Sequence, residues 1–64
     1  MAFNLYSKND DRYVWEADGS TVEHCKRIAK VLAEYLRSEF VVTDCLGEIV
    51  AKSDNTATHR MQWQ

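Results

Sequence analysis

The chain has 64 residues, of which 45% are hydrophobic and 28% are charged, and its formal net charge is −2. A chain of this length buries only about 60% of the surface that its unfolded form exposes, so one small core uses most of the apolar residues. An active-site cleft normally needs a volume of about 300 Å³ or more with several polar groups around it. We therefore predict one domain over residues 1–64 that binds a partner and is not an enzyme.

The charge and hydropathy patterns argue against several other classes. No block of like charge is present, which argues against a general nucleic-acid or membrane-surface protein. No apolar run approaches the ~20 residues of a membrane span, and the first residues lack the features of a signal peptide. We expect a cytoplasmic protein with no membrane contact, whose two cysteines are reduced thiols.

The first third of the chain predicts a β-hairpin. Strands over Ala2–Lys8 and Arg12–Ala17 flank the turn-forming triplet Asn9–Asp11. With a three-residue loop, Leu5 lies opposite Trp15. One face then collects the apolar residues Phe3, Leu5, Tyr13, Trp15 and Ala17. The other face collects Asn4, Tyr6, Lys8, Arg12, Val14 and Glu16.

A helix is predicted next, from about Thr21 to about Ser38. Ser20 and Glu23 have the spacing of a capping box, in which two side chains satisfy free backbone N–H groups at a helix start. Apolar residues then recur every three or four positions, as in a helix with one buried face. These residues are Val22, Cys25, Ile28, Ala29, Leu32, Tyr35 and Leu36.

A second hairpin is predicted from Phe40–Asp44 and Glu48–Lys52. Gly47 suits the left-handed position that closes a three-residue loop. In this register Val42 faces Val50, while Thr43 faces Ile49 and Val41 faces Ala51. Both faces of the hairpin are largely apolar, so the sequence leaves open which face the helix covers.

The last segment, residues 53–64, alternates apolar and polar side chains and is predicted as a fifth strand or a tail. The order is therefore β-β-α-β-β with an optional final strand. We predict an α+β protein in which one antiparallel sheet carries a single helix on one face. Many unrelated small proteins have this size and order, including phage-encoded inhibitors of bacterial defence such as anti-CRISPR proteins.

The residue types that could support catalysis or metal binding do not form a recognised pattern. His24 and Cys25 are adjacent on the predicted helix and point about 100° apart. Cys45 and His59 are isolated, whereas zinc ligands normally occur as closely spaced pairs. The sequence also lacks a glycine-rich phosphate loop and a nucleophile elbow. We predict no catalytic residues, no metal ligands and no cofactor.

The leading hypothesis is a protein-binding module, either an inhibitor that blocks its partner or an accessory subunit. A sheet with only one face under a helix leaves apolar side chains on the other face, and tyrosine and tryptophan are enriched at interfaces. The predicted contact residues are Tyr6, Val14, Val42, Val50 and Trp63.

Two alternatives stay open. The first is a nucleic-acid-binding protein, because Lys26, Lys30 and Arg37 fall on one side of the predicted helix and can contact phosphates. The second is a homodimeric structural protein that buries the same sheet face against its own copy.

Overall fold

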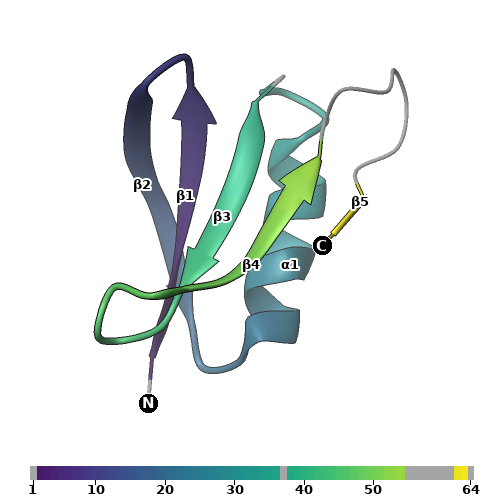
Figure 1. Ribbon diagram of the computed structural model, residues 1–64. Helices are drawn as coiled ribbons and strands as arrows, with labels where there is room; N and C mark the ends of the chain where they lie inside the picture. Colours follow the sequence, from purple (N-terminus) through teal and green to yellow (C-terminus); the bar gives the residue numbers. More distant parts are fainter. Residues whose placement is uncertain (1, 37, 55–61, 64) are drawn as a thin grey trace.

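The computed structural model of the protein describes residues 2–36, 38–54 and 62–63. Its elements are β1 (Phe3–Asn9), β2 (Arg12–Gly19), α1 (Val22–Leu32), β3 (Glu39–Thr43), β4 (Ile49–Asp54) and β5 (Gln62–Trp63). The strands form one antiparallel sheet in the order β2-β1-β3-β4-β5, with β5 only two residues long (Figure 1). The predicted α+β fold with a single helix is confirmed.

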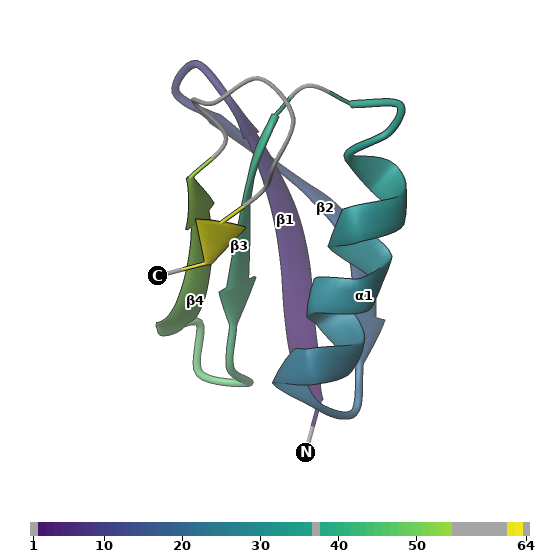
Figure 2. The same cartoon turned by 90° about the vertical axis from the view of Figure 1, so that its right-hand side faces the viewer.

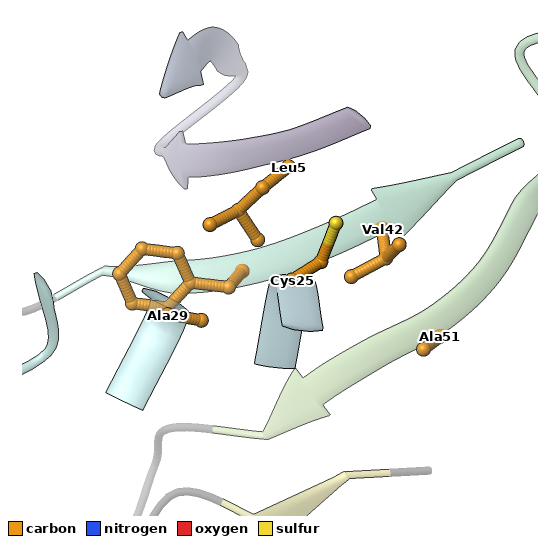
Figure 3. Close-up of a cluster of buried hydrophobic side chains, with 6 residues drawn as sticks. Leu5, Cys25, Ala29, Val42 and Ala51 are labelled. Carbon is orange, nitrogen blue, oxygen red and sulfur yellow. The ribbon is translucent and has the colours of Figure 1, made fainter. Parts of the chain in front are cut away.

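Helix α1 lies along one face of the sheet and forms the core with it (Figure 2). Cys25 and Ala29 point from the helix towards side chains of β1 and β3 (Figure 3). The strands contribute Leu5, Phe40 and Val42. These three side chains and the two from the helix are fully buried. Burying one large aliphatic or aromatic side chain stabilises a protein by about 1.5–3 kcal/mol. The sequence leaves open which face of the second hairpin the helix covers. The structure shows that it is the face with Phe40 and Val42, because both side chains lie under the helix.

The register of the first hairpin differs from the predicted one. The loop has two residues, Asp10 and Asp11, and Asn9 pairs with Arg12. Asp10 has φ 57°, a left-handed conformation that Asp tolerates and that two-residue hairpin turns require. A change of one residue in the register moves side chains to the other face. The predicted faces are therefore wrong for Arg12, Tyr13, Val14 and Trp15. The aromatic pair faces away from the helix, whereas Arg12 and Val14 lie on the helix side.

A bulge in β2 restores the predicted faces further along the hairpin. Tyr6 pairs with Trp15 and Leu5 pairs with Ala17, so Glu16 is an extra residue. Ala17 therefore shares the helix side with Leu5, as predicted. The bulged Glu16 is held by Ser7, whose hydroxyl donates to Glu16 Oε2 at 2.6 Å.

The helix begins one residue later and ends about six residues earlier than predicted. Thr21, and not Ser20, is the N-cap, and its Oγ1 accepts a hydrogen bond from the His24 N–H at 3.1 Å. At the other end the Tyr35 N–H donates to the Leu32 carbonyl at 2.9 Å, three residues back, which tightens the chain into turns. The chain has to return to the sheet by Glu39, where β3 begins. Leu36 continues the apolar spacing of the helix, so the sequence pattern does not show that the helix ends earlier.

The second hairpin has the predicted three-residue loop. Gly47 has φ 86°, and its N–H donates to the Asp44 carbonyl at 3.0 Å. Thr43 pairs with Ile49 as predicted. Beyond that pair, Val42 lies opposite Ala51, because Val50 is an extra residue in a second bulge. The predicted pairs of Val42 with Val50 and of Val41 with Ala51 are therefore wrong.

The predicted fifth strand is confirmed for two residues. Trp63 pairs with Ser53, and Gln62 pairs with Asp54. Ser53 and Asp54, which the prediction assigned to this last segment, belong to β4 instead. Residues 55–61 and 64 of the predicted strand lie outside the described residues. Within the part of the chain that is described, no helix is long and apolar enough to cross a membrane.

Candidate functional site

The sheet face that points away from α1, here called the open face, carries a hollow of about 310 Å³. The residues around this open-face hollow come from four strands and one loop: Tyr6, Tyr13, Val41, Thr43, Gly47 and Ile49. The described part of the helix lies on the other side of the sheet (Figure 2). The hollow is therefore reachable from solvent, unlike the space between helix and sheet.

The hollow has a buried floor and exposed walls. Val41 and Thr43 on the central strand β3 are only 4% and 7% exposed. Tyr13 from β2 and Ile49 from β4 stand on either side and are 54% and 52% exposed. This combination of a buried apolar floor with projecting side chains suits the insertion of one large side chain from another molecule.

Two contacts hold the aromatic side of the open face in place. The Trp15 indole N–H donates to Asn4 Oδ1 at 3.2 Å. The Lys8 ammonium nitrogen lies 5.8 Å from the centre of the Tyr13 ring, within the range of a cation–π interaction. Side chains that are already oriented lose less entropy when a partner binds.

The opposite end of the hollow is fixed by the loop between β3 and β4. Asp44 Oδ1 accepts hydrogen bonds from the Leu46 and Glu48 N–H groups, both at 2.9 Å. The Asp44 N–H also donates to the Glu48 carbonyl at 2.9 Å. This one aspartate therefore determines where Gly47 and Ile49 stand at the rim.

The floor contains a polar atom without a partner. Thr43 Oγ1 is buried and has no hydrogen-bond partner. Leaving a buried hydroxyl unsatisfied costs about 1–3 kcal/mol, which is a large amount for a protein of this size. The atom belongs to a residue that lines the hollow. The sequence gives no signal for this role, since Thr43 ends an ordinary β-branched run.

The five predicted contact residues lie in different places. Tyr6 is on the open face, as predicted, and lines the hollow. Val14 is 49% exposed but lies on the helix side of the sheet, because the hairpin register differs from the predicted one. Val42 is fully buried under the helix, so its assignment to an exposed face is wrong. The sequence could not choose between Val41 and Val42, which are adjacent and chemically identical.

The other two predicted contact residues also lie away from the hollow. Val50 is 44% exposed at the bulge in β4. Trp63 packs against the core, and the Lys26 ammonium nitrogen lies 5.6 Å from the centre of its ring. Five residues of the hollow were not among the predicted contact residues: Tyr13, Val41, Thr43, Gly47 and Ile49. The alternating pattern contains all of them except Gly47, but the assumed loop length placed Tyr13 on the other face.

Two of the three basic residues proposed for phosphate contact, Lys26 and Lys30, lie one turn apart on α1. The Lys26 ammonium group contacts two side chains. It lies over the Trp63 ring, and its nitrogen is 3.8 Å from Glu23 Oε1. Lys30 is exposed in the last turn of α1. Arg37 lies outside the described residues.

The two cysteine thiols lie in different environments. Burial raises the pKa of the Cys25 thiol above its usual value, and the charge of Asp18 raises it further. A raised pKa disfavours the thiolate, which is the reactive form. Cys45 is exposed in the loop between β3 and β4. Across residues 2–36, 38–54 and 62–63, no three His, Cys, Asp or Glu residues are grouped so that they could hold a metal ion. His59 lies outside these ranges.

No family model, curated protein or solved structure matches this chain.

Proposed function

We propose that this protein is a non-enzymatic binding module that holds a protein partner by seating one tyrosine-like side chain in the open-face hollow. The observation that carries this proposal is the unpartnered Thr43 hydroxyl at the floor of an otherwise apolar hollow. The module binds a side chain of its partner without changing it chemically. It therefore acts as an inhibitor or an accessory subunit.

The size of the hollow supports a single side chain. Ligand and cofactor pockets span roughly 300–1,000 Å³, so a volume of about 310 Å³ is at the lower end of that range. Binding energy at protein interfaces is concentrated in a few anchors, with tyrosine and tryptophan the most enriched. One aromatic anchor in this hollow, with Tyr6 and Tyr13 beside it, matches that pattern.

The chemistry of the hollow supports a side chain with a polar tip. Val41 and Ile49 offer apolar contact, whereas Thr43 Oγ1 can donate or accept one hydrogen bond. A phenol ring has an apolar body and a hydroxyl at its end, which is the distribution that this hollow requires. A phenylalanine anchor would leave the Thr43 hydroxyl unsatisfied in a dry interface, at a cost of about 1–3 kcal/mol.

The experiment is capture of the partner from the native host with two lysine variants. Ile49→Lys places a charge at the rim of the hollow, whereas Val31→Lys places the same charge on the outer side of α1. Val31 is 56% exposed and Ile49 52%, so the two variants are matched. We expect both to melt within a few degrees of the parent chain, and only Ile49→Lys to lose the captured protein. Equal capture by Ile49→Lys would contradict the proposal.

A second candidate, a single-stranded nucleic-acid binder, is favoured by the aromatic side chains on the open face. Bases stack on exposed aromatic rings, and Tyr6, Tyr13 and Trp15 share this face with Lys8. Its test is the binding of a labelled oligonucleotide between 50 and 200 mM salt, because phosphate contacts weaken steeply with salt. Salt-sensitive binding that Trp15→Ala abolishes would promote this candidate above a protein partner.

A further inference from the structure

We propose that two copies of this chain associate through β2, by antiparallel pairing of residues 12–16 about a twofold axis at Val14. Strand β2 is the last strand on its side of the sheet, and none of the described residues pairs with its outer edge (Figure 1). An unpaired edge of this kind is a template for another strand. This interface involves the edge of the sheet, unlike the sheet-face homodimer considered from the sequence.

The middle of β2 lacks the protection that edge strands normally have. Charged side chains, proline, a β-bulge and a covering element are the usual means of blocking an edge. Between Arg12 and Glu16 the strand instead has Tyr13, Val14 and Trp15, which are 54%, 49% and 55% exposed. Three consecutive exposed apolar residues on an open edge favour pairing with another strand.

The alternation of backbone hydrogen bonds along the hairpin is compatible with this twofold axis. The residues that flank a two-residue hairpin loop exchange hydrogen bonds, and the pattern then alternates along the strands. Arg12 flanks the loop, so it and Val14 direct their backbone groups to β1. Tyr13 and Trp15 direct theirs outward. An axis at Val14 places Tyr13 opposite Trp15 of the second copy, so that the outward groups of both strands meet.

The side chains complement one another about the same axis. Arg12 and Glu16 are each two residues from Val14, so antiparallel pairing places Arg12 opposite Glu16 of the second copy, and the reverse pair forms on the other side. Opposite charges directly across two strands are favourable, and like charges are not. The two Val14 side chains meet in the centre. This symmetry of charge is the reason that the occupant is a second copy and not an unrelated strand.

The pairing is limited to five residues by the structure at either end. Beyond Arg12 the chain turns at Asp10 and Asp11, and at Glu16 the bulge bends the strand. A longer ladder in this register would also bring Asp18 opposite Asp10 of the second copy. The dimer joins two open faces into one surface, and its pairing residue Tyr13 also lines the open-face hollow. The two residues that the test changes, Arg12 and Glu16, do not line the hollow. The two proposals can therefore fail independently.

The test is sedimentation velocity of the full chain and two charge-reversal variants, Arg12→Glu and Glu16→Arg. The parent chain is expected to sediment as a dimer at high micromolar concentration. Each variant alone places like charges opposite each other in both pairs, so each is expected to be monomeric. An equimolar mixture of the two variants restores both opposite-charge pairs, and we expect a heterodimer.

The mixture makes the result specific to this register. A monomeric parent chain, variants that still dimerise alone, or a mixture that stays monomeric would each overturn the proposal. Glu16→Arg also loses the bond from Ser7, so its melting is recorded. If this variant does not fold, Val14→Lys replaces it, since two lysines then meet on the axis. A dimeric Val14→Lys would refute the interface.

Discussion

The two faces of the sheet use apolar residues in different ways. Under α1 the core side chains are fully buried between the helix and the strands (Figure 3). On the open face, Val41 and Thr43 are almost as buried, but their neighbours Tyr13 and Ile49 remain about half exposed. The burial of a side chain alone therefore does not distinguish the core from the candidate binding site. The distinguishing features are the exposed walls and the unsatisfied hydroxyl.

The largest difference between the faces is expected in the cost of truncation. Phe40→Ala removes a fully buried ring under the helix and should cost about 3–5 kcal/mol, enough to unfold most of the protein. Tyr13→Ala on the open face should cost under about 1 kcal/mol, because its ring is 54% exposed. Urea unfolding followed by circular dichroism measures both. Similar costs for the two variants would remove the distinction between the faces.

The loop at the rim of the hollow offers the next test. Asp44→Ala removes the acceptor of two backbone hydrogen bonds and should cost about 1–2 kcal/mol. It should also weaken partner capture, because Ile49 stands directly beyond this loop. Asp11→Ala, an exposed aspartate in the other hairpin turn, is the matched control and should change neither quantity. Unchanged stability and unchanged capture in Asp44→Ala would contradict this role of the loop.

The covered face is expected to respond to alkaline pH through Cys25. Burial, aided by Asp18, raises the pKa of this thiol in the folded state above the unfolded value of about 9.0. The unfolded chain therefore loses this proton first as the pH rises. The stabilisation is present below pH 9 and declines above it, by at most about 1.4 kcal/mol per pH unit. Chemical denaturation at pH 8–10 should show a steeper decline for the parent chain than for Cys25→Ala, and equal slopes would contradict this cause.

The smallest expected change in the free energy of unfolding has the opposite sign to the others, because it stabilises the protein. Thr43→Val keeps the shape of the side chain and removes the unsatisfied hydroxyl, so the free energy of unfolding should rise by about 1 kcal/mol. The same substitution should weaken capture of the partner. Thermal melting alongside capture measures both. A destabilised Thr43→Val would show that the hydroxyl already has a favourable interaction in the free protein.

The helix and both hairpins could be predicted from the sequence, because periodicity and turn residues report local structure. The faces could not be predicted with the same success. Asn9, Asp10 and Asp11 all suit a turn, so nothing local distinguishes a two-residue loop from a three-residue one. The bulge at Glu16 also has no sequence signal, yet it restores Ala17 to the helix side. One residue of loop length therefore decided where the aromatic residues lie.

The site was harder to predict than the fold for a related reason. Val41 and Val42 are identical in chemistry, and only contact with α1 decides which one enters the core. Likewise, an unsatisfied hydroxyl depends on the absence of a neighbouring polar group in three dimensions. Tyr6 was assigned to the correct face because its position relative to Leu5 does not depend on the loop.

The central claim is that the hollow selects an aromatic ring with a polar tip through Thr43. The most direct measurement is an NMR titration of the methyl signals of Val41 and Ile49 with p-cresol and with toluene, which mimic the side chains of tyrosine and phenylalanine. Both ligands should shift these signals, and Thr43→Val should reduce the preference for p-cresol over toluene by about two- to tenfold. An unchanged preference, or no shift with either ligand, would contradict the account.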